Sequence, residues 1–213
     1  MVVVIAGGHG QIALRLERLL ADGGHRARGL IRNPDHAGDV EAAGAEATVL
    51  DLEREDDVSP AVEGADAVVF AAGAGPGSGP ERKRTVDLGA AVKLIDAARA
   101  AGVRRYVMIS AMGAADPASG SEAMRPYLDA KAEADAALEA SGLDHTIVRP
   151  GRLTDDPGTG RVAVAERLGR TGEITRDDVA ATLVAVLEND ATIGRTFELL
   201  QGDTPIAEAL AQL

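Results

Sequence analysis

Residues 2–13 of the chain read VVVIAGGHGQIA, and this stretch decides the fold. The unbroken apolar run at its start is typical of a strand that is buried on both faces of a parallel sheet. The glycines that follow mark a tight turn, and Leu16, Leu19 and Leu20 then recur at helical spacing. Strand, tight turn and helix in this order predict the first unit of an α/β domain.

The turn has the residue types that a bound pyrophosphate requires. Gly7 permits the change of direction, Gly10 lets the backbone approach a phosphate, and the small Ala13 lets the helix pack close to the strand. Free N–H groups and the dipole at the start of the helix favour the same anion. We therefore expect a nicotinamide dinucleotide here, although glycine turns of this kind also occur for structural reasons alone. The residues assigned to it are Gly7, Gly8, His9, Gly10, Gln11 and Ile12.

Apolar runs of strand length alternate with helix-period segments along most of the chain. Strands are predicted near 1–6, 26–31, 46–50, 66–72, 104–110, 145–149 and 195–200, and helices at about 11–22, 38–43, 56–62, 83–101, 124–141 and 176–189, with a short helix after them. This alternation predicts an α/β fold, a doubly wound parallel sheet of the Rossmann type, in a single domain that spans residues 1–213.

Composition narrows the function. The chain of 213 residues has a formal net charge of −12, which repels nucleic acid and anionic lipid, so we expect a small-molecule partner and neither nucleic acid nor membrane. The absence of cysteine excludes disulfides and thiolate sites, and the four histidines are scattered, so no metal is expected. The first strand has no basic segment before it and runs straight into glycines, which favours a cytoplasmic protein over a secreted one.

A stretch rich in glycine and proline, Gly73–Pro80, follows the fourth predicted strand. Its composition predicts a mobile loop. Because it leaves the carboxyl end of a strand, it lies at the edge where open α/β sheets bind ligands. Either a flap over the cofactor or a plain flexible connector fits this pattern. Ala71, Ala72 and Gly73 are expected to contact the cofactor.

The end of the second strand bears on the choice between NAD and NADP. NAD sites place an acidic residue about 20 positions after the turn, whereas a basic residue suits the 2′-phosphate of NADP. The strand ends at Arg32 without an acid, so we expect NADP(H) to be preferred and NAD(H) to be possible; a solvated arginine is the alternative. Asp51 and Leu52 follow the third strand beside the expected adenine, where Asp51 either accepts from its amino group or caps the next helix.

Tyr127 and Lys131 lie four residues apart in a predicted helix, so both side chains project from one face. A phenol with a pKa of about 10 is a poor proton donor at neutral pH, and a nearby ammonium lowers that pKa. A shift of roughly three units corresponds to about 4 kcal/mol, which requires close approach away from water. Ser110 ends the fifth strand at the same edge and can hydrogen-bond a substrate carbonyl. Taken alone, the Tyr–Lys pair is also explained by a core edge beside a solvated face.

These motifs, in this order, resemble the short-chain dehydrogenase/reductase superfamily, specifically its small atypical members, which are often named NAD(P)H-binding or NAD-dependent epimerase/dehydratase proteins. The resemblance spans nearly the whole chain. It rests on Gly7-x-x-Gly10-x-x-Ala13, Arg32-Asn33-Pro34, Val86-Asp87, Val107-Met108-Ile109-Ser110-Ala111, Tyr127-x-x-x-Lys131 and Thr146-Ile147-Val148-Arg149-Pro150-Gly151.

The resemblance implies hydride transfer from the nicotinamide to a carbonyl carbon, with Tyr127 giving a proton to the oxygen and Ser110 orienting it. It also implies that Lys131 binds the nicotinamide ribose. From Pro150 onward, residues 151–213 are expected to complete the sheet, close the nicotinamide end and shape the substrate pocket. Asp87 stands where active relatives carry an asparagine of a proton relay, which changes both the charge and the donor capacity of that position.

Three functions fit these observations. The first is an NADPH-dependent reductase of a small carbonyl compound, the second an epimerase or dehydratase with tightly held NAD, and the third a regulator that senses NADP(H) without turnover. The segment 152–173 is too short for the larger lobe of sugar-nucleotide epimerases, which argues against a nucleotide-sugar substrate. The helices predicted at 83–101 and 124–141 are largely alanine with charges, so we expect a monomer or a weak homodimer.

Overall fold

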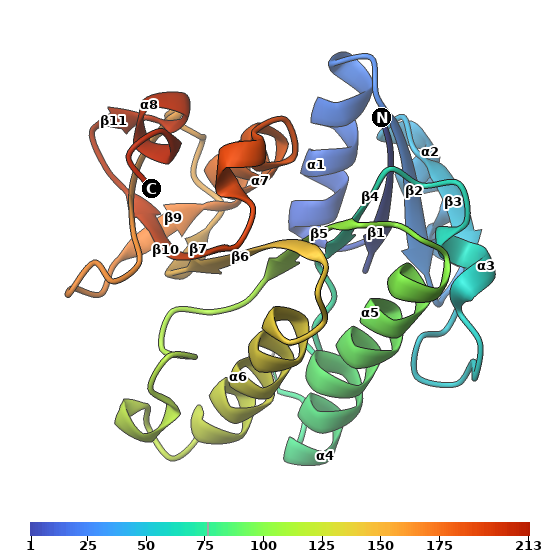
Figure 1. Cartoon of the computed structure of the whole chain (residues 1–213), viewed down its shortest axis with the longest axis horizontal. Helices are drawn as coiled ribbons and strands as arrows, with labels where there is room; N and C mark the ends of the chain where they lie inside the picture. Colours follow the sequence, from blue (N-terminus) through green and yellow to red (C-terminus); the bar gives the residue numbers. More distant parts are fainter. Residues whose placement is uncertain (76) are drawn as a thin grey trace.

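A nine-stranded sheet in the order β11-β8-β10-β6-β5-β4-β1-β2-β3 crosses the molecule, with helices on both faces (Figure 1). The computed structural model describes residues 1–75 and 77–213. The strands are β1 Val2–Ala6, β2 Arg26–Ile31, β3 Glu46–Val49, β4 Ala67–Phe70, β5 Arg105–Ile109, β6 Asp144–Pro150, β7 Arg152–Thr154, β8 Arg161–Ala165, β9 Glu173–Thr175, β10 Arg195–Gln201 and β11 Thr204–Pro205. The α-helices are α1 Gln11–Asp22, α2 Ala37–Ala42, α3 Ser59–Val62, α4 Pro80–Arg82, α5 Ala91–Ala100, α6 Arg125–Glu139, α7 Arg176–Leu187 and α8 Ile206–Leu210.

The chain reverses its winding direction between β1 and β4. Strand β1 pairs in parallel with β2 on one side and with β4 on the other. The chain winds outward through β2 and β3 in one direction and through β4, β5 and β6 in the other. The predicted doubly wound Rossmann sheet is therefore confirmed, and its crevice at the carboxyl ends of β1 and β4 is where such sheets bind ligands.

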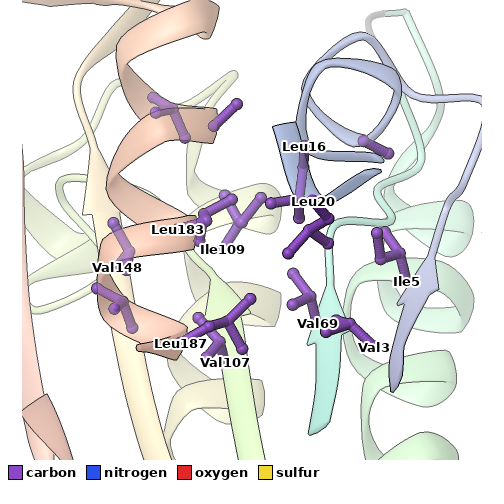
Figure 2. Close-up of a cluster of buried hydrophobic side chains, with 14 of the residues drawn as sticks. Val3, Ile5, Leu16, Leu20, Val69, Val107, Ile109, Val148, Leu183 and Leu187 are labelled. Carbon is purple, nitrogen blue, oxygen red and sulfur yellow. The ribbon is translucent and has the colours of Figure 1, made fainter. Parts of the chain in front are cut away.

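Each face of the sheet has its own apolar core. Leu16 and Leu20 of α1 meet Leu183 and Leu187 of α7 above Ile109 of β5 (Figure 2). All five are fully or almost fully buried, and each leucine contributes about 2 kcal/mol through removal from water. Helices α5 and α6 cover the opposite face, where their apolar residues join those of β4 and β5. The helix predicted at 176–189 is confirmed as α7, and its apolar residues lie in the core.

The helix predicted at 83–101 is longer and less regular than expected. The helical run begins at α4, continues as a π-helix over Lys83–Ala90 and ends as α5. A π-helical turn accommodates an extra residue and occurs often at functional sites. By contrast, the helix predicted at 56–62 is shorter than expected, because only Ser59–Val62 are helical. Of the predicted loop Gly73–Pro80, Pro76 lies outside the described residues.

The C-terminal part contains strands that the sequence did not indicate. Strand β8 pairs antiparallel with β10, and β7 pairs with β9 in a separate small sheet. Asp178 of α7 holds the preceding loop by accepting hydrogen bonds from the N–H groups of Thr159 and Gly160. The hydroxyl of Thr175 accepts from the N–H of Asp178 and so caps the start of α7. No helix within the described ranges is long and apolar enough to cross a membrane.

Glu17 of α1 is a fully buried carboxyl directly behind the glycine turn. One of its oxygens lies 3.2 Å from where a Cβ on Gly8 would be and 2.5 Å from one on Gly29. Neither oxygen has a hydrogen-bond partner among the residues that the structure describes. Burial raises the pKa of Glu17 from 4.5 to about 8, so the neutral acid is the favoured form in the fold.

This buried carboxyl predicts a pH-dependent stability. Between about 4.5 and about 8 the folded chain holds a proton that the unfolded chain releases. The free energy of unfolding should therefore fall as pH rises through this window, by as much as ~5 kcal/mol, and level off above it. Glu17→Gln, which resembles the neutral acid, should remove this slope. Denaturant unfolding at several pH values measures it, with the exposed Glu41→Gln as the control. Equal slopes in wild type and Glu17→Gln would contradict the neutral carboxyl.

Candidate functional site

A cavity of about 360 Å³ opens at the carboxyl ends of β1, β2 and β4, in the crevice of the sheet. It brings together most of the residues expected to bind a cofactor: Gly7, His9, Gly10, Arg32, Asp51, Leu52, Ala71, Ala72 and Gly73. Sequence reasoning missed the rest of the lining: Leu30, Ile31, His36, Leu50, Glu53, Ala74, Arg82, Val86 and Ala90. Most of these missed residues belong to strand ends or irregular segments, where periodicity gives no signal.

The glycine turn forms a cradle in which backbone takes the place of side chains. Gly7 has a φ of +78°, and a Cβ on it would lie 2.8 Å from the Cα of Ala72. A Cβ on Gly10 would lie 2.9 Å from the carbonyl oxygen of Gly7. Helix α1 begins directly after Gly10, so its first N–H groups have no helical acceptors and face this cradle. The donor set fits the pyrophosphate of a dinucleotide.

Five expected cofactor residues do not line the cavity. Gly8 packs against β2 instead: its N–H donates to the carbonyl oxygen of Leu30 at 2.9 Å, and a Cβ on it would lie 2.7 Å from the Cα of Gly29. Gly8 is therefore required for close packing of the turn. The other residues outside the lining are Gln11, Ile12, Lys131 and Pro150.

The far end of the cavity, where the adenosine would lie, is polar. Arg32 follows β2 with a largely exposed guanidinium, whose Nη1 lies 3.6 Å from Oε2 of Glu53. Asp51 accepts the N–H of Glu53 at 3.0 Å within a turn, and the next helix, α3, begins only at Ser59, so the predicted helix-capping role of Asp51 is wrong. Its other oxygen lies 3.5 Å from Nε of Arg54. Asp51 still lines the cavity, so its contact with the adenine stays a prediction.

His9 of the turn lies in a small polar cluster with α2. Its ring stacks on that of His36 with 3.6 Å between the ring centroids. Its Nε2 lies 2.8 Å from a carboxylate oxygen of Asp39. These contacts fix the ring at the rim of the cavity. No metal-binding group of three or more acidic or histidine side chains occurs in residues 1–75 and 77–213.

Lys131 and Asp87 form a buried ion pair at the other end of the site. The Nζ of Lys131 lies 3.4 Å from Oδ1 of Asp87 and donates to the carbonyl oxygen of Ile109 at 3.1 Å. Oδ2 of Asp87 accepts the N–H of Ala74, which belongs to the cavity lining. Burial lowers the pKa of Lys131, and the carboxylates of Asp87 and Asp135 oppose that shift. Asp87 thus connects the cofactor cavity to Lys131.

The predicted lowering of the pKa of Tyr127 is wrong in direction. Burial raises the pKa of Tyr127 above its usual range, and the nearby carboxylates of Asp87 and Asp135 raise it further. The Nζ of Lys131 is 5.9 Å from the centre of the phenol ring and is paired with Asp87, so its charge is largely compensated. The Nζ of Lys83, which sequence reasoning did not consider, lies closer, at 5.0 Å. Tyr127 is therefore a neutral phenol.

Ser110 has a partner that the sequence reasoning missed. Its hydroxyl donates to Oδ2 of Asp135 at 2.8 Å, so its proton is not directed at a substrate carbonyl. The same oxygen accepts from Nε of Arg149 at 2.9 Å. Burial raises the pKa of Asp135, and Arg149 and Ser110 oppose this. The sequence spacing could have indicated Asp135: it follows Lys131 by four residues, as Lys131 follows Tyr127, and therefore lies on the same face of the helix.

Arg149 also lines a second, wider hollow of about 750 Å³. Its lining comes from the segment between β5 and α6, from α6 and β6, and from the part of the chain after β6: Ala115, Glu139, Arg149, Ala165, Glu166, Arg167, Gly194 and Thr196. The residues after 151 therefore do build walls next to the Ser110 and Asp135 end of the site. That this hollow receives a substrate stays an expectation.

Comparison with known proteins supports the geometry. Residues 7–190 match the family model described as NAD(P)H-binding. A Bacillus subtilis protein called an uncharacterized sugar epimerase is 46% identical over 215 residues, and the match covers all of both chains.

Two solved structures are similar over almost their whole length. A Bacillus halodurans protein, whose name gives it as an NAD-dependent epimerase/dehydratase, has a TM-score of 0.96 and 41% identity over all of both chains. The oxidoreductase ylbE of Lactococcus lactis has a TM-score of 0.89 and 29% identity, covering all of this chain and 96% of that one.

The cradle predicts a sharp effect of one methyl group. Gly10 has a φ of −66°, which alanine adopts freely, so Gly10→Ala acts only through the 2.9 Å approach to the oxygen of Gly7. We expect it to weaken dinucleotide binding at least roughly tenfold, because the turn must shift away from the pyrophosphate. Nicotinamide fluorescence on titration measures this. Gly38→Ala in α2, where a Cβ meets nothing within 4 Å, is the matched control. Unchanged affinity of Gly10→Ala would place the pyrophosphate elsewhere.

Proposed function

This chain belongs to the NAD(P)H-binding family of Rossmann-fold proteins, and from that premise we propose that it is an NADP(H)-dependent reductase of a small carbonyl compound. Its relatives include proteins named as an oxidoreductase and as a sugar epimerase, and these names support an enzymatic use of the bound cofactor. The proposal assigns the proton transfer to Tyr127, and the place of its phenol beside the buried Lys131–Asp87 pair is the observation that carries it.

A phenol with a raised pKa suits reduction better than oxidation. Reduction needs a donor that is protonated before the reaction, and burial keeps Tyr127 in that form. An alkoxide is about as basic as hydroxide and is a much stronger base than a phenolate, so even a weakly acidic phenol gives up its proton to it. Oxidation of an alcohol would instead require the phenolate, which this environment disfavours.

In the proposed reaction the bound nicotinamide supplies a hydride to the carbonyl carbon. Tyr127 gives its phenolic proton to the carbonyl oxygen, which becomes the hydroxyl of the product, and recovers a proton from water. Lys131 lies beside Tyr127 and is held by Asp87 and the carbonyl oxygen of Ile109, so its position is fixed before any substrate enters. Ser110 can donate a hydrogen bond to the substrate only after the hydrogen bond from its hydroxyl to Asp135 breaks.

The preference for NADP(H) is part of the proposal and rests on Arg32. Its guanidinium is at the rim of the cavity, after β2, where the 2′-phosphate of NADP would lie. Planar guanidinium groups bind phosphates through paired hydrogen bonds. No acidic residue occupies the end of β2, where NAD sites hold one.

A second candidate function, the sensing of NADP(H) without turnover, has its own support. Lys131 is paired with Asp87, and the hydroxyl of Ser110 donates its hydrogen bond to Asp135. Two expected catalytic groups therefore have partners within the protein. These contacts hold Lys131 and Ser110 in place whether or not chemistry occurs there. The name of a relative supports an epimerase activity. The short segment between β7 and β9, however, argues against a nucleotide-sugar substrate.

The reductase proposal predicts the behaviour of Tyr127→Phe. Removing the phenolic proton should lower the rate constant of carbonyl reduction by at least roughly a hundredfold and leave the affinity for NADPH unchanged. The wild-type rate should also stay level from neutral to mildly alkaline pH, because the raised pKa keeps the donor protonated. Loss of NADPH absorbance with a panel of small aldehydes and ketones measures both. Full turnover by Tyr127→Phe would reject the donor, and firm binding without turnover by the wild type would favour the sensor.

The cofactor proposal predicts a selective loss in Arg32→Glu. A carboxylate at this position repels the 2′-phosphate, so NADPH should bind roughly tenfold more weakly or worse, while NADH should bind about as well as to the wild type. Nicotinamide fluorescence with each cofactor in turn gives the two dissociation constants. Equal weakening of both cofactors, or none of either, would remove Arg32 from phosphate recognition.

A further inference from the structure

Glu53 joins two arginines across the adenosine end of the cavity. Its Oε2 lies 3.6 Å from Nη1 of Arg32 and 3.2 Å from Nη2 of Arg82. Its Oε1 accepts the hydroxyl hydrogen of Thr85 at 2.8 Å. A single carboxylate thus holds two guanidinium groups that reach it from different parts of the fold.

The two arginines come from different walls of the cavity. Arg32 follows β2, whereas Arg82 ends α4, just beyond the glycine-rich loop after β4. Both line the cavity together with Glu53 and with the cradle glycines Gly7 and Gly10. In a chain with a formal net charge of −12, this end of the cavity carries two cations, Arg32 and Arg82, and two carboxylates, of which Glu53 bridges the arginines and Asp51 does not.

A phosphate is a better partner for this pair of arginines than the carboxylate that they hold. A phosphate monoester carries a charge of about −1.5 to −2 and three acceptor oxygens, whereas a carboxylate carries one negative charge on two oxygens. Both arginine side chains and Glu53 are partly exposed, and exposed ion pairs contribute only about 0–1 kcal/mol, so the carboxylate is exchanged at little cost.

We infer that Arg32 and Arg82 close on the 2′-phosphate of NADP from two sides, and that Glu53 occupies their donors until the phosphate displaces it. The inference rests on the proposed NADP(H) preference and adds a second phosphate ligand and an internal competitor. Binding of the phosphate draws α4 towards the end of β2.

Glu53 also has a role with the unphosphorylated cofactor. NAD sites use an acidic residue that accepts the ribose hydroxyls, and the end of β2 has none. Glu53, which follows β3, brings a carboxylate into the same end of the cavity. The ribose hydroxyls of NAD can donate to it while the arginines stay paired. One carboxylate therefore favours NAD and opposes NADP.

Binding of NADPH and NADH to single variants tests the inference without any substrate. Nicotinamide fluorescence at one fixed ionic strength gives both dissociation constants. Arg82→Gln should weaken NADPH roughly tenfold and NADH less than about twofold, because the lost donor served the phosphate. Glu53→Gln should bind NADPH roughly threefold more tightly and NADH roughly threefold more weakly. A shift of the two cofactors in opposite directions cannot come from a loss of folding.

Arg84→Gln is the matched control. Arg84 lies two residues from Arg82, is largely exposed, pairs with Glu133 and does not line the cavity, so the same change of charge there should leave both constants unaltered. Thermal unfolding of each variant verifies the fold.

The outcomes separate this inference from the proposed function. If Arg32→Glu loses NADPH selectively while Arg82→Gln does not, the two-sided clamp is rejected and Arg32 keeps its role. If Glu53→Gln leaves the ratio of the two constants unchanged, the displaced carboxylate is rejected. If the wild type binds neither cofactor, the proposed function fails and the inference fails with it.

Discussion

The contact between the turn after β1 and the end of β4 governs the rest of this structure. Backbone meets backbone there: the N–H of Ala71 donates to the carbonyl oxygen of Ala6 at 3.0 Å, and Gly7 leaves no room for a side chain beside Ala72. The two segments touch without side chains between them. Beyond this contact the turn continues into α1 and the segment after β4 runs the other way, and the cofactor cavity lies in the crevice between them. The positions of α1 and of the loop that carries Ala74 both follow from this contact.

The other end of the site depends on four buried charges. Lys131 pairs with Asp87, and Arg149 pairs with Asp135, so the charges balance. Moving an ion out of water costs several kcal/mol, and an apolar set of similar volume would stabilise the fold as well or better. Titratable groups with strongly shifted pKa values occur most often at functional sites. The arrangement also explains why Tyr127 is neutral: the cation expected to polarise it is already compensated.

The sequence indicated the fold well wherever periodicity was clear. Buried strands such as β1 and β5 are continuous apolar runs, and α7 has apolar residues at helical spacing, so elements and winding could be predicted. Strands β7, β8 and β9 could not, because they are short and lie in a segment rich in glycine, aspartate and threonine. The glycine cradle was found from its motif, whereas Glu53 and Arg82 lie in irregular or short segments and meet only through tertiary contacts. The buried partners of Ser110 and Lys131 are likewise tertiary, which is why the pKa of Tyr127 was predicted in the wrong direction.

The π-helical stretch from Lys83 to Ala90 restricts how the chain can change in length. It places Asp87 against Lys131, while α4 immediately before it carries Arg82 to the cavity. Removal of one residue from this stretch would favour an ordinary α-helix and rotate everything before the deletion by about 100° relative to α5. Arg82 and Lys83 would then turn away from the site while the sheet stayed intact. This segment should therefore tolerate substitutions at its exposed positions far better than insertions or deletions.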